Sequence, residues 1–82
     1  MHINSLRMLA RKVDADKEYG GKDTRVVIKS SPYGTPVYIG RSGKFSESKK
    51  ENAFVYLYDT DGVSAQLMAC AEQALLIEVE PA

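Results

Sequence analysis

The chain has 82 residues, of which 44% are hydrophobic and 27% are charged. A chain this short offers one hydrophobic core, so we expect a single globular domain over residues 1–82. Its 11 basic and 11 acidic residues balance. This balance argues against a polycation that coats nucleic acid and against a polyanionic tail.

The cysteine and histidine counts limit the chemistry. Cys70 is the one cysteine and His2 the one histidine, and no N-terminal secretion signal is evident. We therefore expect a cytoplasmic protein without an internal disulfide, and neither a zinc site nor Ser-His-Asp or Cys-His catalysis. The longest apolar run, residues 53–58, is far shorter than the ~20 residues of a membrane-spanning helix. No cofactor is predicted.

The zero net charge conceals an asymmetry along the chain. All 11 basic residues and five acids lie in residues 1–50, a net charge of +6, whereas residues 51–82 hold six acids and no Lys or Arg, a net charge of −6. Whether the folded protein keeps this dipole depends on which elements lie side by side.

Residues 3–17 have the pattern of an amphipathic helix. Ile3, Leu6, Leu9 and Val13 recur at three-to-four spacing, which places them on one face. The Gly-Gly pair that follows can end the helix, because glycine adopts the left-handed conformation common just past a helix end.

Two strands are predicted over residues 24–30 and 36–41, because both segments are rich in β-branched residues and bounded by polar ones. Pro32 and Gly34 lie between them and favour a chain reversal, so we expect an antiparallel hairpin. Residues 42–52 are polar and unpatterned. We expect them to form the longest loop, where mobility concentrates.

Residues 53–59 form the third predicted strand. Its alternation places one set of side chains on the core face: Ala53, Val55 and Leu57. The opposite face then carries three aromatic residues: Phe54, Tyr56 and Tyr58.

A second helix is predicted over residues 62–74, with Thr60 or Asp61 as its cap. Its inner stripe is Val63, Leu67, Cys70 or Ala71, and Ala74. Residues 75–80 close the chain as a strand whose inward side chains are Leu75, Ile77 and Val79.

The order helix-β-β-β-helix-β predicts an α+β fold with one small mixed sheet of about four strands and two helices. The second helix acts as a right-handed crossover, which brings the last strand in parallel to another. Placing the last strand beside the first gives the spatial order 3-2-1-4. This order sets Glu78 and Glu80 near Arg25 and Lys29, on the face opposite the core.

Several segments follow one another in order: Val37-Tyr38-Ile39-Gly40, a Ser/Glu/Lys loop, Ala53-Phe54-Val55, a short helix and a closing Leu-Ile-Glu-Val strand. In this order they resemble small proteins of phages and mobile elements, integron gene-cassette products among them. The resemblance covers residues 25–80 and is one of element pattern. It implies a protein that binds a host or partner protein, often as a dimer, and it assigns no functional residue.

Two short motifs share part of an ion-binding or nucleotide-binding pattern. The run Gly40-Arg41-Ser42-Gly43-Lys44 lacks the phosphate-loop glycine, because Tyr38 stands at its position, and Phe45 replaces the Ser or Thr. The run Asp59-Thr60-Asp61-Gly62 lacks the later ligands of a calcium loop. A plain loop and helix-capping carboxylates are the better interpretations. Cys70 is expected to pack in the core.

The sheet face opposite the predicted core is more apolar than a solvated face should be. Its outward residues are Val27, Tyr38, Phe54, Tyr56, Tyr58 and Leu76, alongside Arg25, Lys29, Glu78 and Glu80. Two arrangements would account for it. Either the N-terminal helix covers this face, or both helices cover the other one and the aromatic face becomes an interface.

The favoured hypothesis is a non-enzymatic protein-protein interaction module of unknown biological role, acting as a homodimer through the aromatic sheet face. Its partner-binding residues would be Tyr38, Phe54, Tyr56 and Tyr58. The alternative is nucleic-acid binding by basic residues and a tyrosine of the 25–50 region: Lys29, Tyr33, Arg41, Lys44, Lys49 and Lys50. An enzyme is disfavoured, because no nucleophile–base pair is evident.

Overall fold

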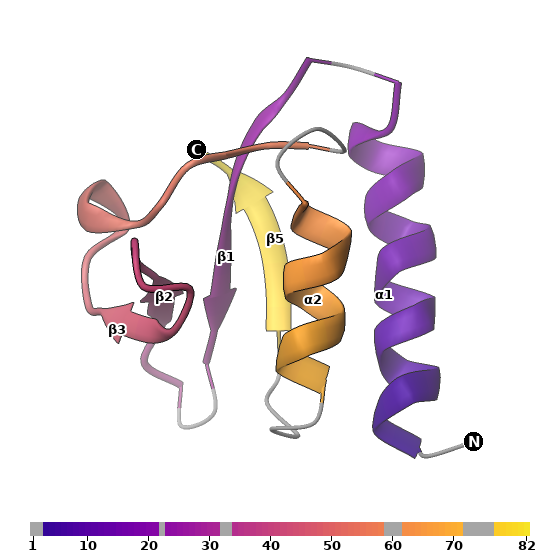
Figure 1. The fold of residues 1–82 in the computed structure, drawn as a ribbon, viewed down its shortest axis with the longest axis horizontal. Helices are drawn as coiled ribbons and strands as arrows, with labels where there is room; N and C mark the ends of the chain where they lie inside the picture. The colour runs from indigo at the N-terminus through magenta and orange to yellow at the C-terminus, as the bar shows by residue number, and fades with distance from the viewer. Residues whose placement is uncertain (1–2, 22, 32–33, 59–61, 72–76) are drawn as a thin grey trace.

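The described part of the chain contains one sheet, two α-helices and one short 3-10 helix (Figure 1). A computed structural model describes residues 3–21, 23–31, 34–58, 62–71 and 77–82, without the side chains of residues 3–9, Ser64, Met68 and Ala71. The fold class is α+β, as predicted. Both helices lie along the same side of the sheet (Figure 1), and neither described helix has the length and apolarity needed to cross a membrane.

The helix α1 spans Ile3–Tyr19, which confirms the predicted helix and extends it by two residues. It ends at the glycine pair, where the Gly20 N–H donates to the Asp16 carbonyl at 2.8 Å. Gly21 follows with a φ of 77°, in the left-handed region that glycine adopts without steric cost.

Contacts with Tyr58 set the rotation of α1 about its axis. The Tyr58 hydroxyl donates to Asp16 Oδ1 at 2.5 Å, and its ring centroid lies 5.8 Å from that of Tyr19. Ala15 and Tyr19 therefore face the core, whereas Val13 is 46% exposed. The prediction that Val13 lies on the buried stripe is wrong, because burying the larger tyrosine ring outweighs burying one valine.

The strand β1 (Arg25–Ser30) is the centre of the sheet. On one edge its C-terminal half pairs with β2 (Val37–Ile39), and its N-terminal half pairs with β4 (Tyr56–Leu57). On the other edge it pairs along most of its length with β5 (Ile77–Pro81). Each of these pairings is antiparallel. The predicted hairpin and the predicted neighbourhood of the first and last strands are thus confirmed.

The segment predicted as a long loop contains regular structure. The strand β3 (Phe45–Glu47) pairs antiparallel with β2, and the 3-10 helix η1 (Lys50–Asn52) follows it. Only residues 56 and 57 of the third predicted strand form β4, which lies beside β1 and not beside β2.

This extra strand overturns the prediction of a mixed sheet. β3 reverses the chain once more than expected, so β4 runs antiparallel to β1. The helix α2 (Val63–Ala71) then crosses over β1 and brings β5 in parallel to β4, as a crossover helix should. Because β4 is itself antiparallel to β1, so is β5, and the predicted parallel pair does not form.

The core lies between the sheet and the two helices. The predicted inner stripe of α2 is confirmed at Val63, Leu67 and Cys70, which are all buried. They pack in one cluster with side chains from β1, β2, β4, β5 and α1: Val26, Ile28, Ile39, Tyr56, Tyr58, Ile77, Ala15 and Tyr19.

Several predicted features fall outside the described residues. They are His2, the turn residue Pro32, the helix cap at Thr60 or Asp61, the helix end at Ala74, and the strand residues Leu75 and Leu76. The same holds for the side chains of Ile3, Leu6 and Leu9.

We expect Tyr58→Phe to lower the free energy of unfolding by about 1–2 kcal/mol, because it removes a hydrogen bond to a carboxylate. Chemical denaturation measures this loss. A double-mutant cycle with Asp16→Ala, which removes the acceptor, should show strong coupling between the two positions. Additive effects would contradict the role assigned to this hydrogen bond.

Candidate protein-binding surface

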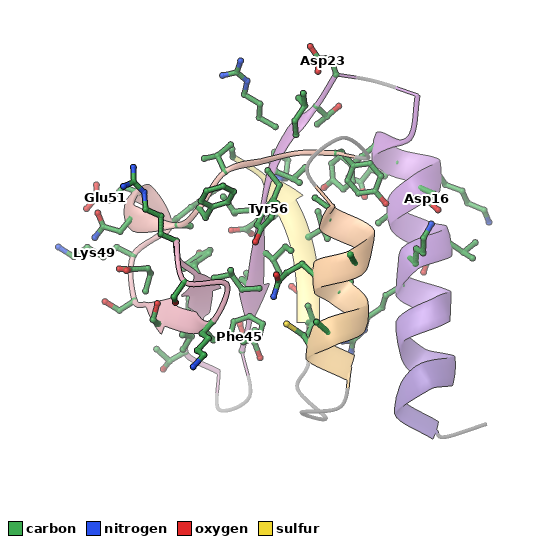
Figure 2. All side chains as sticks on the ribbon, viewed as in Figure 1. Asp16, Asp23, Phe45, Lys49, Glu51 and Tyr56 are labelled. Carbon is green, nitrogen blue, oxygen red and sulfur yellow. The ribbon has the colours of Figure 1, made fainter. Side chains whose placement is uncertain are left out.

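The predicted aromatic sheet face does not form. Tyr38, Tyr56 and Tyr58 are 7%, 7% and 2% exposed, and of the four predicted partner-binding residues only Phe54 is exposed, at 37%. Tyr56 and Tyr58 project to the core side of the sheet, toward the helices, as Figure 2 shows for Tyr56. Both alternating sets of this strand are apolar, so the sequence pattern did not determine which set faces inward. The structure buries the two tyrosine rings, Tyr56 and Tyr58.

Tyr38 does lie on the face opposite the helices, but a charged network and Lys50 of η1 cover part of this face. Lys29 Nζ lies 3.0 Å from Glu80 Oε2 and 3.6 Å from Glu78 Oε2. Lys50 Nζ of η1 approaches Glu80 Oε1 at 3.7 Å. The predicted proximity of Lys29 to both glutamates is confirmed, so part of the charge asymmetry cancels within the sheet.

The network shifts the titration of its members. Partial burial raises the pKa of the Glu80 carboxyl, but the hydrogen bond and charge of Lys29, the charge of Lys50 and the Tyr38 hydroxyl outweigh it and hold this pKa below its usual value. The hydrogen bond to Glu80 likewise raises the pKa of Lys29. Burial, followed by the charge and hydrogen bond of Glu80, raises the pKa of Tyr38.

Two neighbouring apolar side chains remain at the surface just before β4. Val55 is 46% exposed and Phe54 is 37% exposed. The Phe54 ring packs edge-on against the ring of Tyr56, with 4.7 Å between centroids, so it is held in place while one side stays open. Exposed apolar residues next to each other are typical of a binding surface.

Hollows lie on both sides of Val55. One of about 570 Å³ opens over the outer face of β1, and one of about 390 Å³ opens toward β2 and β3. We call Phe54, Val55 and the other residues that line these hollows the Phe54–Val55 surface: Val27, Arg41, Glu47, Lys49, Lys50, Glu51, Asn52, Ala53 and Ala82. Figure 2 shows Lys49 and Glu51 at η1, far from α1. The surface thus has an apolar centre with charges of both signs around it.

The residues predicted to bind nucleic acid lie in different surroundings, although Arg41, Lys49 and Lys50 all line the Phe54–Val55 surface. Arg41 and Lys44 lie in the turn between β2 and β3, whereas Lys29 is held by two glutamates. Lys50 pairs with Glu80, and Tyr33 lies outside the described residues.

The glycine-rich run before β3 is a turn between two strands. The Gly43 N–H donates to the Gly40 carbonyl at 3.0 Å, and Gly43 has a φ of 79°. Gln66 Nε2 of α2 donates to the Gly43 carbonyl at 2.8 Å, which fixes the turn against the helix. A phosphate loop leads from a strand into a helix, so this geometry does not match one.

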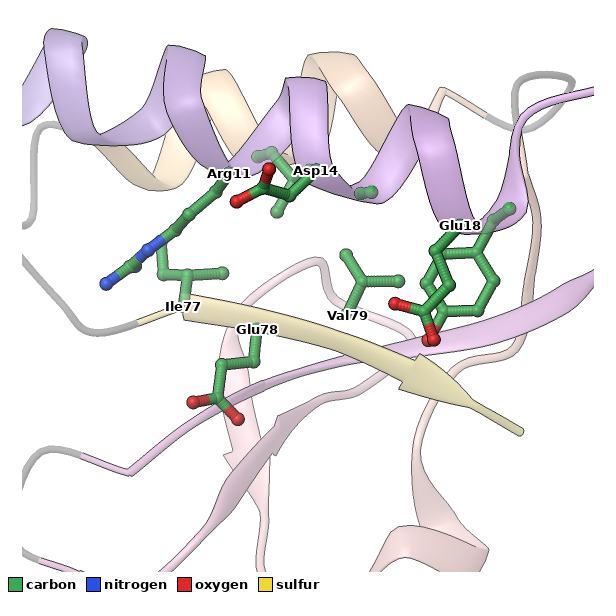
Figure 3. A pocket seen from close by; sticks show the side chains of 9 residues that line it. Arg11, Asp14, Glu18, Ile77, Glu78 and Val79 are labelled. Atoms are coloured by element: carbon green, nitrogen blue, oxygen red, sulfur yellow. The ribbon is translucent and has the colours of Figure 1, made fainter.

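A third hollow, of about 350 Å³, lies between α1 and β5 (Figure 3). Ile77 and Val79 point from β5 toward α1, while Asp14 and Glu18 come from the helix and Glu78 points the other way (Figure 3). Burial raises the pKa of Tyr19 at one end, with the charge and hydrogen bond of Glu18 adding to the effect. This hollow has a charged rim, but among the described residues that line it we find no exposed large apolar side chain.

The described residues hold no cluster of three or more metal-ligating side chains. Cys70 is buried, and its sulfur lies 3.5 Å from Gln66 Nε2. The calcium-loop carboxylates at Asp59 and Asp61 lie outside the described residues.

Sequence reasoning named Phe54 but missed Val55, which it placed in the core. It also missed Glu47, Glu51 and the cover that η1 gives to β1. The one available signal was the mixed charge of residues 47–51, directly before an apolar run.

Comparisons with models of protein families, with curated proteins and with solved structures find no match to this chain. The resemblance to small proteins of phages and mobile elements therefore stays a prediction. The fold and the surface define a small α+β domain with an exposed apolar patch, and this patch is the feature that bears most directly on function.

We expect Glu80→Gln to lower the free energy of unfolding at pH 7 by about 1 kcal/mol, because Lys29 loses its nearest charged partner. The folded protein holds the Glu80 pKa below its usual 4.5, so this contribution is complete above that value and disappears as the pH falls through the lowered pKa. The difference between variant and wild type in chemical denaturation should therefore shrink in acid.

Glu51→Gln is the matched control. Its carboxylate lies 4.0 Å from Lys49 Nζ and its side chain is 74% exposed, so we expect no measurable change. Equal losses in the two variants, or a Glu80→Gln deficit that is independent of pH, would contradict the role of the network.

Proposed function

We propose that this protein is a non-enzymatic protein-interaction module that works as a homodimer through the Phe54–Val55 surface. The observation that carries the proposal is the pair of exposed apolar side chains, Phe54 and Val55, beside two hollows. Burying such side chains is the main favourable term in most protein association.

The charges around the apolar centre favour a second copy as the partner. Arg41, Lys49 and Lys50 provide three cations, and Glu47 and Glu51 provide two carboxylates. In a two-fold dimer the same patch faces itself, so it must be complementary to its own image. A patch with both signs of charge meets this condition, whereas a purely basic patch would repel itself.

The small size of the chain supports the same proposal. A standard interface buries about 800 Å² per partner, and the chain exposes 5314 Å² in total. A domain of 82 residues has a small core, so burying part of its surface in a dimer adds stability. A cytoplasmic location fits as well, because the cysteine Cys70 is buried and unpaired.

Light scattering behind a sizing column tests the proposal. We expect a dimer of two 9.1 kDa chains at high micromolar concentration. Val55→Ser should raise the dimer dissociation constant roughly tenfold to thirtyfold, because each of two copies loses about 1 kcal/mol of apolar burial.

Val13→Ser is the matched control, since Val13 is also a valine with 46% exposure but lies on α1, far from the surface. It should leave the dissociation constant unchanged. A strict monomer at these concentrations, or equal effects of both serine variants, would contradict the proposal. Salt-sensitive binding of single-stranded DNA or RNA, lost in Lys49/Lys50→Glu, would favour a nucleic-acid function instead.

A further inference from the structure

The main chain of residues 54–58 alternates in direction. The Phe54 N–H donates to the Ile39 carbonyl of β2 at 2.8 Å, and the Tyr58 N–H donates to the Thr24 carbonyl at 3.0 Å. Between them, Tyr56 pairs with Val26 of β1. Backbone groups of successive residues in an extended strand point to opposite sides. Val55, between two residues that bond inward, therefore directs its N–H and C=O away from the sheet.

Val55 occupies an open position. β4 is the last strand on its side of β1 in the described part of the chain. Val55 itself is 46% exposed, with a hollow on each side. An exposed edge of β-branched and aromatic residues is a template for pairing with another strand.

We infer that two copies of the chain pair their 54–56 segments antiparallel, about a two-fold axis at Val55. This inference rests on the proposed homodimer and specifies its geometry. Because both backbone groups of Val55 point outward, Val55 of each copy can donate its N–H to the C=O of Val55 in the other, as a reciprocal hydrogen-bonded pair. The two sheets then join into one.

The second copy fits this edge better than a strand of another protein for two reasons. The register centred on Val55 is self-complementary, since it places Phe54 of each copy opposite Tyr56 of the other, as cross-strand aromatic neighbours. The charges beside the edge, Lys49 and Lys50 against Glu51, also include both signs, so the two copies meet without net repulsion.

Hydrogen exchange of the wild-type protein, followed by NMR, tests the pairing. The Val55 amide should exchange at least about tenfold more slowly in the dimer than at concentrations where the chain is monomeric. The Phe54 amide, bonded to Ile39 within the chain, is the internal control and should keep the same protection in both states.

Disulfide trapping tests the register. In a hydrogen-bonded antiparallel pair the Cα atoms lie about 5.5 Å apart, within the range that a disulfide spans. Val55→Cys should therefore cross-link to itself under mild oxidation. Ala53→Cys should not, because its two copies would lie roughly 13 Å apart along the strands.

The outcomes separate this inference from the proposed function. A dimer whose Val55 amide stays unprotected, or in which Ala53→Cys cross-links to itself as readily as Val55→Cys does, would overturn the strand pairing and leave the side-chain interface in place. Slow exchange of Val55 in the monomer would also overturn it. A chain that remains monomeric would overturn both.

Discussion

The structure depends on β1, to which every other strand of the described chain except β3 is hydrogen-bonded. Its odd-numbered residues bond toward β5, as the Arg25 carbonyl does with Ala82, and its even-numbered residues bond toward β4 and β2, as Val26 does with Tyr56. Its side chains divide in the same way. Val26 and Ile28 enter the core, while Val27 and Lys29 face the opposite side. One six-residue strand therefore sets the register of the sheet and both of its faces.

Covering the second face of β1 determines which part of the surface remains for a partner. The segment between β2 and β4, residues 40–55, folds back over the sheet. The Phe54 N–H bonds to the Ile39 carbonyl, and Lys50 forms an ion pair with Glu80. This closure buries Val27 and Tyr38 without a further helix from the described chain. It also leaves the end of this segment, Phe54 and Val55, at the edge of the sheet. The strands β2 and β4 share one edge of β1, and no strand of the described chain lies beyond Val55. The candidate surface is thus a consequence of how the sheet is closed.

Much of the fold was predictable from local patterns, and the candidate site was predictable only in part. The helix α1, the hairpin of β1 and β2, the inner stripe of α2 and the pairing of β5 with β1 agree with the sequence-based expectations. The prediction that Lys29 meets Glu78 and Glu80 followed from the strand order and is confirmed. Phe54 was correctly predicted to be exposed at the site. Tyr38, Tyr56 and Tyr58 were predicted to be exposed, but the structure buries them.

The sequence by itself determined the fold class and the position of most elements, because helical and strand periodicity, β-branched residues and glycines act over a few neighbouring residues. The tertiary structure decided three things that no local pattern contains. A short polar strand, β3, changed the direction of the last strand. The packing of Tyr58 against Asp16 and Tyr19 decided which side of α1, and which side of the chain at β4, faces the core. In the segment 53–58 both faces are apolar, so only the competition for space in the core decided that Tyr56 is buried and Val55 is exposed.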